Sequence, residues 1–560
     1  MIKIQPQYLS LSKLLDRRLF RIPDYQRAYS WTSQQRDDLF DDLIKTHVKG
    51  KDEGHFMAAL VCLRRGTQEL GTDEFQVLDV VDGQQRITTL ILLLKTICVA
   101  LDSKDKTQKK LQGELSDLLV KPDSDELLLL QTNHDSSHYF SDYLRKGKIA
   151  PVSNANTTAD REILLAIEDC RRFVSRWRDN VSDLIALGAL LKNRLYFLLH
   201  EIEEEKTVYT VFEVLNSRGL SVSWLDRLKS ILMGVAFELP KVDTDSLIKE
   251  LHTKWRDIYA VIGLRQGLST EALRFAATLR ARTAPSRTMS EEDAVHALRD
   301  LALNSAKGLR EVASWLLEVT KASDRVVANH RLNAVTRISQ ARLLAVAISL
   351  RDDISKADKE KLLAQWERVT FRIYGMMGND ARTRVGDYIR LAWQVVNENL
   401  SKAEIGRGIA AIGKDFPIEK AVDELRNANC YEGWEVELRY FMFRYEEHLS
   451  RNKGMIFSKD QWEKIWMASP SDSIEHIHAK SKAPEKQKHR LGNLVLLTPN
   501  LNSKLSAKPA KEKADSYIKT GLLVAGRVGA MISKSGAWSK KEIEAWEGEL
   551  VAWAEKEWAD

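Results

Sequence analysis

The sequence is poor in cysteine, and its four cysteines are scattered. Cys62, Cys98, Cys170 and Cys430 lie far apart, and no two of them form a C-x-x-C pair. This spacing excludes a disulfide-rich scaffold and a zinc knuckle built from paired cysteines. It suits a reducing compartment, and we expect the protein to be cytoplasmic.

The sequence also has no apolar run long enough for a membrane span. Its start, MIKIQPQYLS, lacks an apolar core behind a basic tip, so we do not expect a secretory signal. The longest apolar stretch, residues 87–101, is interrupted by Lys95 and falls short of the ~20 residues that a membrane helix needs. We predict a buried helix there and no membrane partner.

What remains is the composition of an ordinary globular protein, with 44% hydrophobic and 29% charged residues. At 560 residues the chain is too long for one core. Residues 1–238 mix strand and helix patterns, residues 239–425 repeat apolar positions at helical spacing, and residues 426–560 combine helices with two short strands. We therefore predict an α+β, predominantly helical protein of three domains: an α/β domain, a helical connecting domain and a third domain that carries the motif below.

Charge of neither sign dominates, because 85 basic residues nearly balance 79 acidic ones. Basic residues nevertheless gather between residues 479 and 519, where ten Lys or Arg face three acids. A polyanion is a plausible ligand for such a cluster, and a solvated basic surface is the alternative. The candidate contacts to a nucleic-acid backbone are Lys480, Lys482, Lys486, Lys488, Arg490 and Lys504.

The cluster follows a segment with an unusual set of side chains, SDSIEHIHAKSKAPEKQKHRLGNLVLLTPNLNSKL (471–505). DSIEHIHA (472–479) and RLGNLVLLT (490–498) read as two strands that pair across a basic loop. TPNLNSKLSAKPAKEKADSY (498–517) predicts one helix, with Thr498 as its cap and Pro499 in its first turn. A hairpin followed by a helix can bring Glu475, His476, Asn493 and Asn502 to one cleft.

These residue types suit phosphodiester hydrolysis. The reaction needs a base to take a proton from water, and a divalent cation to neutralise the developing charge. We predict that His476 is the base, because its pKa lies near neutrality. Carboxylate and amide oxygens suit magnesium or manganese, so we predict that Glu475 and Asn502 are ligands. Asn493 would tie strand to loop and orient His476, and His478 would contact phosphate or metal.

The same residues resemble a known family. The pattern IEHIHA…LGNLVLLTPNLNSKLS is similar to the His-Asn-His (His-Me finger) nuclease domain, whose fold is a ββα-metal unit. Two positions depart from its usual pattern: Ala479 replaces a proline, and Asn502 stands where some members have histidine. The first departure removes no chemical group, and the resemblance implies an endonuclease domain.

A second concentration of functional residue types lies near the start of the chain. FQVLDVV (75–81) predicts a strand that ends at the turn pair Asp82-Gly83, and a helix follows. Gly83 permits close backbone approach, and the helix N-terminus at Gln84 and Gln85 attracts phosphate, as does Arg86. A plain turn and helix cap is the alternative.

Three segments together resemble the ParB/sulfiredoxin-like DGQQR domain of the GmrSD-type restriction enzymes. They are RIPDYQRAYSWT (21–32), VVDGQQRITTL (80–90) and FEVLNSRGLSVSWLDRLKS (212–230). In the third we expect a helix that ends near Gly219 and a new helix from Ser223, with Asp226 completing a capping box. Asn216, Arg218 and Lys229 could then close over a phosphate.

This resemblance implies a modification-dependent (type IV) nuclease of antiphage defence that acts on double-stranded DNA. It also implies that Asp82, Gly83, Gln84, Gln85 and Arg86 bind and hydrolyse a nucleoside triphosphate, GTP or ATP. Tyr25, Gln26 and Arg27 would line an adjoining pocket that senses the modified DNA. The chain has no G-x-x-x-x-G-K-[ST] loop, so nucleotide hydrolysis would have to use this other route.

Two other functions are compatible with the sequence: a non-catalytic switch that senses DNA or nucleotide, and an RNA-directed nuclease toxin. A site that only grips DNA needs lysines and no general base, so the pair His476 and Asn502 favours an enzyme. No feature of the sequence indicates contact with a 2′-hydroxyl, so the sequence does not decide between DNA and RNA as the substrate. With one centre per chain, cutting both strands suggests a homodimer.

Overall fold

The computed structural model describes residues 5–23, 28–50, 53–70, 73–121, 127–128, 130–132, 137–203, 223–240, 243–302, 305–426 and 428–560. The chain divides into two compact units, the first formed by residues 1–273 and 291–320 and the second by residues 274–290 and 321–560. The finer division at residues 238 and 425 stays a prediction.

The first unit is built on a mixed β-sheet. Within its described residues, six strands form this sheet in the order β1-β8-β3-β4-β2-β7. The pairs β1·β8 and β3·β4 are antiparallel, whereas β8·β3, β4·β2 and β2·β7 are parallel. The strands span Gln5–Ser10 (β1), Arg18–Ile22 (β2), His55–Leu70 (β3), Asp73–Asp82 (β4), Leu130–Thr132 (β7) and Leu195–Ile202 (β8).

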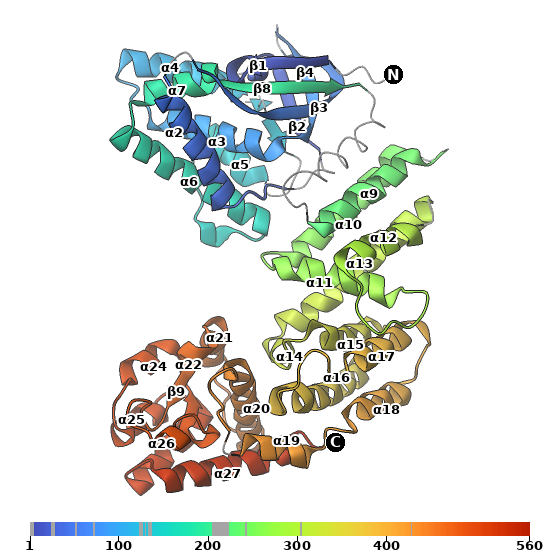
Figure 1. The fold of residues 1–560 in the computed structure, drawn as a ribbon, viewed down its shortest axis with the longest axis vertical. Coiled ribbons are helices and arrows are strands. Elements are labelled where there is room, and N and C mark those ends of the chain that lie inside the picture. Colours follow the sequence, from blue (N-terminus) through green and yellow to red (C-terminus); the bar gives the residue numbers. More distant parts are fainter. Residues whose placement is uncertain are drawn as a thin grey trace. The chain divides into compact units, whose positions relative to one another are not determined.

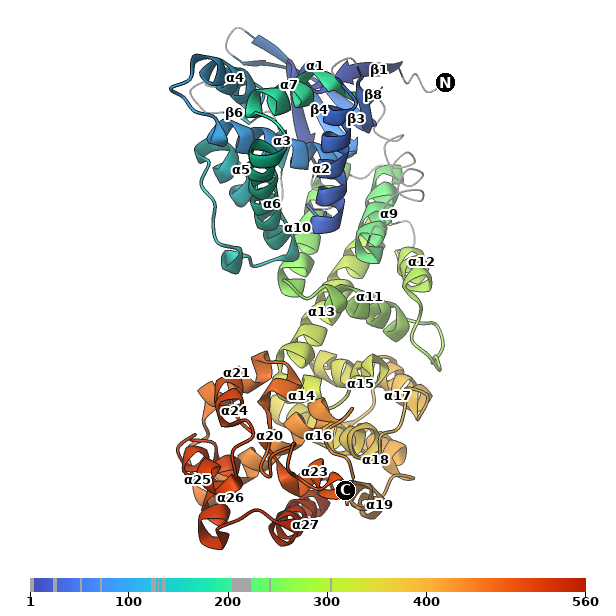
Figure 2. The ribbon, with the colours of Figure 1, turned by 60° about the vertical axis from the view of Figure 1, so that its left-hand side comes forward.

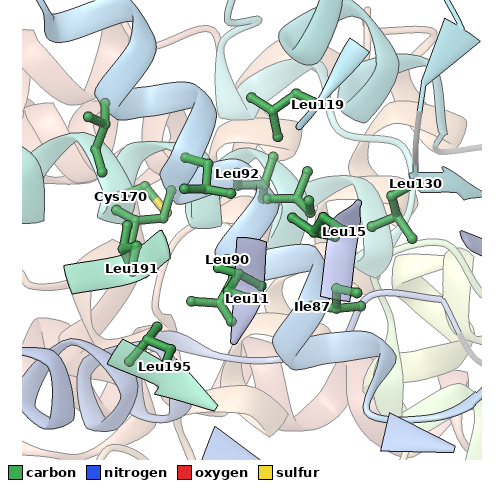
Figure 3. Packing of buried hydrophobic residues seen from close by; sticks show 14 of the residues in the cluster. Leu11, Leu15, Ile87, Leu90, Leu92, Leu119, Leu130, Cys170, Leu191 and Leu195 are labelled. Atoms are coloured by element: carbon green, nitrogen blue, oxygen red, sulfur yellow. The ribbon is translucent and has the colours of Figure 1, made fainter. Parts of the chain in front are cut away.

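Helices cover one face of this sheet (Figures 1 and 2). They are α1 (Leu11–Leu15), α2 (Ser33–Val48), α3 (Gln84–Ala100), α4 (Lys106–Asp117), α5 (Ser137–Lys146), α6 (Thr158–Asn180) and α7 (Leu184–Arg194). Side chains alternate between the two faces of a strand, so Phe20 joins the large core under the helices while its neighbour Leu19 joins a small cluster with Phe75 and Val77. Figure 3 shows that large core, where leucines of α1, α3 and α7 meet.

Helix α3 lies at the centre of this core. Leu90, Leu92, Leu93 and Leu94 on it are fully buried. The prediction of a buried helix at residues 87–101 is therefore confirmed, as is the strand before it, which β4 contains. Within the described part of the chain, no helix is both long enough and apolar enough to cross a membrane.

The described residues of the segment from Ser223 to residue 426 are mainly helical, and the prediction of helices over residues 239–425 is confirmed for them. Its helices are α9 (Trp224–Glu238), α10 (Thr244–Ile262), α11 (Gln266–Leu279), α12 (Glu291–Leu301), α13 (Ala306–Ala328), α14 (His330–Ala334), α15 (Ser339–Leu350), α16 (Lys356–Thr370), α17 (Val385–Asn397), α18 (Lys402–Gly413) and α19 (Ile418–Leu425). A π-helical turn, Phe371–Met376, extends α16. Helix α9 begins where we expected it, because the Ser223 hydroxyl accepts the Asp226 amide at 3.2 Å.

The C-terminal part of the second unit contains a short hairpin among helices (Figure 1). Its strands are β9 (Ile474–His476) and β10 (Leu494–Leu496), which pair antiparallel with Leu494 opposite His476. The helices around them are α20 (Glu435–Lys453), α21 (Lys459–Met467), α22 (Pro470–Ser473), α23 (Glu485–Lys488), α24 (Pro499–Leu505), α25 (Ala510–Ile518), α26 (Leu523–Ser535) and α27 (Lys540–Glu557). The predicted hairpin and the helix after it are therefore present, although each strand has only three residues.

The prediction of one helix over residues 498–517 is wrong. Thr498 and Pro499 do begin a helix, but α24 ends at Leu505 and α25 begins at Ala510. Ser506 between them has a φ of 40°, and Pro509 lacks the amide hydrogen that a continuous helix would need. This break makes α25 a separate helix, and its residues Lys513 and Tyr517 contact Glu475 of β9.

The cysteine prediction agrees with the fold. All four cysteines are buried and free. The protein is a mixed α/β protein in which helix predominates, as the composition and periodicity indicated.

Candidate functional site

Asn493 ties the hairpin together at its loop end. This fully buried side chain follows the loop and stands directly before β10, in a short 3-10 turn. Its Oδ1 accepts the backbone N–H of His478 at 2.8 Å, and its Nδ2 donates to the carbonyls of His478 at 3.1 Å and Lys488 at 2.9 Å. Asn493 thus joins the segment after β9 to the end of the basic loop, rather than lying on the strand itself.

The glycine before it permits the approach of α27. A Cβ at Gly492 would lie 2.0 Å from the carbonyl oxygen of Ile543, so no other residue fits there without moving the helix. The indole of Trp538 also donates to the Gly492 carbonyl at 3.2 Å. The L-G-N sequence is therefore required by packing as well as by the turn.

Asn502 fastens α24 to the hairpin. Its Nδ2 donates to the carbonyl of Asp472 at 2.8 Å and to that of Ile474 at 3.2 Å. These carbonyls lead into β9, so Asn502 lies beside the residue that precedes Glu475. The amide nitrogen makes both contacts, and the side-chain oxygen Oδ1 is the atom that a cation would use.

Glu475 is buried against α25, where it meets a lysine. Its Oε1 lies 2.5 Å from the ammonium of Lys513 and accepts the hydroxyl of Tyr517 at 3.0 Å. Lys513 is 0% exposed and also donates to the carbonyl of His476 at 2.9 Å. Burial raises the pKa of the Glu475 carboxyl, whereas Lys513 and Tyr517 act in the opposite direction.

His476 points to a different neighbour, another histidine. Its Nε2 lies 3.0 Å from Nδ1 of His489 in the loop between the strands, and both rings are buried. Burial, followed by the nearby His489 and three lysines, lowers the pKa of His476 to about 3. The pKa of His476 therefore does not lie near neutrality, where we expected it from the sequence, because the ring is buried beside cationic groups. The imidazole is neutral at physiological pH, and the neutral form has a lone pair that can accept a proton.

His478 lies beyond the end of β9, in a bend. Its Nδ1 is buried and has no hydrogen-bond partner among the described residues. Burial, and then the charge of Lys513, lowers its pKa. A buried ring nitrogen without a partner is costly unless a ligand completes it, so His478 can offer a lone pair to a cation or a proton to a phosphate.

The described residues contain no group of three or more His, Cys, Asp or Glu side chains placed to hold a metal ion. A cation at this hairpin would therefore have to use Asn502 together with Glu475 and His478. Both contacts of Glu475 reach Oε1, so its Oε2 would be the coordinating oxygen.

Most of the predicted backbone-binding residues lie at the surface of the loop and of α24. Lys480, Lys482, Lys486 and Lys504 are exposed, and Lys488 is half-buried with its ammonium 3.2 Å from Glu485. Arg490 differs from them, because its guanidinium binds both oxygens of Glu547 on α27 and also Glu544. It stabilises the packing of α27 and is not directed to solvent.

In the first unit, the turn between β4 and α3 has the expected geometry. Gly83 has a φ of 92°, and a Cβ there would lie 2.7 Å from a methyl group of Leu60. Asp82 ends β4, and Gln84 is buried at the first position of α3. Glycine is thus required at this turn by its backbone conformation and by the close approach of β3.

The side chains of Gln85 and Arg86 contact the segment that precedes α2. Gln85 accepts the amide of Ser30 at 2.8 Å and donates to the carbonyl of Ala28 at 3.1 Å. The Arg86 guanidinium stacks 5.6 Å from the centre of the Trp31 ring, and partial burial lowers its pKa. Gln85 therefore holds this segment in place, whereas Arg86 remains half-buried at the start of α3.

Some predicted site residues lie outside the described residues: Tyr25, Gln26, Arg27, Asn216 and Arg218. The expected helix end near Gly219 lies there too. Lys229 is described and is buried on α9, where its ammonium lies 5.7 Å from the centre of the Tyr259 ring.

Sequence reasoning missed the partners of the two central side chains, Lys513 and Tyr517 for Glu475 and His489 for His476. The first two stand four residues apart, on one face of a helix, but this spacing does not reveal a partner on a distant strand. His489 stands four residues before Asn493 without a motif of its own, so only the fold reveals it.

Two family models match the chain. Residues 11–233 match the N-terminal domain of the GmrSD restriction endonuclease, and residues 416–553 match the C-terminal domain of the GmrSD restriction endonucleases. The second match contains the whole hairpin with α24, α25 and α26, and the first contains the β4–α3 turn. No curated protein matches the chain.

Proposed function

The chain belongs to the GmrSD restriction endonuclease family, and from that premise we propose that it is an endonuclease of the His-Asn-His type that cuts modified double-stranded DNA in antiphage defence. Membership of the family makes it a restriction endonuclease with DNA as its substrate. The observation that carries the finer proposal is the buried imidazole of His476 on a hairpin whose turn is held by Asn493 and whose loop is lined with lysines.

His476 is the general base in this proposal. Hydrolysis of a phosphodiester begins when water loses a proton as it attacks phosphorus, and a neutral imidazole accepts that proton. The lowered pKa of His476 keeps its ring neutral throughout the physiological range, so one ring nitrogen carries a lone pair. Asn493 keeps the backbone after His476 in place, so that the ring has one orientation.

The proposal includes a divalent cation held by residues near His476. Glu475 offers a carboxylate oxygen and Asn502 an amide oxygen, the donors that magnesium and manganese prefer, and His478 offers a buried nitrogen that has no partner among the described residues. When bound, such an ion neutralises the charge that develops on the phosphate and on the leaving oxygen. Lys513 would remain on the other carboxylate oxygen of Glu475 and keep that side chain fixed.

The exposed lysines of the loop and α24 bind the DNA backbone in this proposal. Three of them, Lys480, Lys482 and Lys486, follow strand β9, and Lys504 lies two residues after the proposed metal ligand Asn502. They would therefore place the scissile phosphate near His476. Arg490 is excluded from this role by its ion pairs with α27.

The first unit binds and hydrolyses a nucleoside triphosphate, GTP or ATP, in the same proposal. The backbone amides at the N-terminus of α3 and the positive end of its helix dipole would bind phosphate, and Arg86 provides a positive charge beside Trp31. Gln85 supports this site indirectly, by holding residues 28 to 30 next to it.

The experiment incubates the purified protein with phage DNA that carries modified cytosine and with the same DNA without modification. Each DNA is tested with and without magnesium, and with each triphosphate. The proposal predicts cleavage of modified DNA only, and only with the metal. Cleavage of both DNAs alike would refute the modification requirement, and cleavage in the presence of a chelator would refute the metal.

A further inference from the structure

A second buried histidine, His489, contacts the proposed base His476. His489 lies in the loop between the two strands, and its side chain is only 8% exposed. One ring nitrogen, Nδ1, meets Nε2 of His476 at 3.0 Å. The other, Nε2, lies 3.7 Å from Oε1 of Glu432.

The turn that precedes α20 holds this arrangement. Tyr431 stacks on the His489 ring, with ring centres 5.1 Å apart and planes 8° from parallel, and it meets His476 edge-on at 4.8 Å. The amide of Cys430 donates to the His489 carbonyl at 2.8 Å. Both the ring and the backbone of His489 are therefore fixed by residues 430 to 432.

Glu432 is itself oriented. Its backbone N–H donates to Oδ1 of Asn429 at 3.0 Å, and Nδ2 of Asn429 donates to its Oε2 at 3.1 Å. The Asn429 contact leaves Oε1 as the oxygen nearer His489. A carboxylate beside one ring nitrogen favours the tautomer that carries its proton on that nitrogen.

We propose that His489, aided by Glu432, is a positioning residue that selects the tautomer of His476 and so decides which of its nitrogens is the base. This inference rests on the proposed function and deepens it. In a neutral imidazole one nitrogen donates and the other accepts. With its proton on Nε2, facing Glu432, His489 accepts through Nδ1. His476 must then donate through Nε2, and its Nδ1 keeps the lone pair that takes the proton from water.

Three substitutions at one position separate this role from packing. His489→Asn keeps a polar atom near the place of Nδ1, His489→Gln moves it toward the place of Nε2, and His489→Phe keeps only a ring for Tyr431 to stack on. We expect single-turnover cleavage by the Gln and Phe variants to fall by about 10- to 100-fold, with DNA affinity unchanged. The Asn variant should retain most of the wild-type rate.

Glu432→Gln tests the outer residue. We expect a loss smaller than that of His489→Phe, and no additional loss when Glu432→Gln is combined with His489→Phe, because Glu432 acts only through His489. Additive losses would show that Glu432 acts by another route and would overturn the assignment of the pair.

A measurement that does not depend on cleavage completes the test. In protein labelled with ¹⁵N-histidine, the spectrum should show His476 protonated on Nε2 in the wild type and in His489→Asn, but not held in that form in His489→Phe. If His476→Ala abolishes cleavage while all three His489 variants cut at the wild-type rate, the inference is wrong and the proposed function stands. If His476→Ala cuts normally, the proposed base itself is wrong. A proton on Nδ1 of His476 in the wild type would overturn the inference whatever the rates.

Discussion

Lys513→Met tests the role of the buried lysine, because it removes a charge that no solvent replaces. Lys513 is 0% exposed, and the side chain of Glu475 is 5% exposed. Methionine has a similar volume, so the substitution deletes the ammonium and leaves the packing of α25 largely intact. Two contacts are lost: the ion pair to Glu475 at 2.5 Å and the hydrogen bond to the His476 carbonyl at 2.9 Å.

The expected loss of stability comes from the Glu475 carboxylate, which stays buried without a cationic partner. A carboxylate would remain buried, with only the Tyr517 hydroxyl to support it. Removing one partner of a buried ion pair costs about 3–5 kcal/mol, most of which is the penalty of the unpaired charge. We expect the free energy of opening the β9–β10 hairpin to fall by that amount, which corresponds to hydrogen exchange roughly 10²- to 10⁴-fold faster.

The assay is hydrogen exchange of peptides that cover residues 474–497, because the two units need not unfold together and a single unfolding midpoint would mix them. Glu475→Gln combined with Lys513→Met is the matched control. It removes the unpaired charge, so it should exchange more slowly than Lys513→Met alone.

Manganese adds a second arm to this assay. In Lys513→Met the Glu475 carboxylate has lost its cationic partner, and a bound manganese ion would balance its charge. Manganese should therefore restore protection from exchange more strongly in this variant than in the wild type. The double variant should gain little. Exchange within about threefold of the wild type for Lys513→Met, or an equal effect of manganese on all three proteins, would refute the reasoning.

Three further predictions concern His476, Arg86 and the lysines of the loop. The pKa of His476 is lowered from 6.5 to about 3 in the folded protein, so its contribution to stability is complete above pH 6.5 and is lost as pH falls toward 3. Hydrogen exchange of peptides that cover residues 474–497, corrected for the intrinsic effect of pH on exchange, should show the wild type losing about 2 kcal/mol more than His476→Ala between pH 7 and pH 5, and equal losses would contradict this. Arg86→Ala should abolish nucleotide hydrolysis, while Arg64→Ala, an exposed arginine on β3, should leave it unchanged; normal turnover by Arg86→Ala would remove the assignment of the α3 site. Replacing Lys480, Lys482 and Lys486 with glutamine should weaken DNA binding alike for all sequences and reduce the slope of log K against log salt by about 3, whereas an unchanged slope would place the DNA elsewhere.

The local patterns of the sequence predicted elements well where one segment determines its own structure. FQVLDVV followed by Asp82-Gly83 gave the β4–α3 turn, because the β-branched run and the glycine each act locally. Thr498 and Pro499 likewise marked the start of α24. The error over residues 498–517 was avoidable, since Pro509 is itself a local signal against a continuous helix.

Contacts between distant segments were beyond such reasoning. The sequence predicts that Arg490 binds the DNA backbone, but its guanidinium forms an ion pair with Glu547, 57 residues away in the chain. Glu475 meets Lys513 across 38 positions of sequence, and only the break between α24 and α25 brings the lysine to it. A single sequence carries no record of which distant charges pair.

The most direct test of the central claim, that His476 is the base of a DNA-cutting hairpin, is the single-turnover cleavage rate of His476→Ala beside that of the wild type, with DNA affinity measured in parallel. The account predicts a rate at least about 100-fold lower in the variant, with DNA binding and nucleotide hydrolysis retained. Cleavage at the wild-type rate would contradict it.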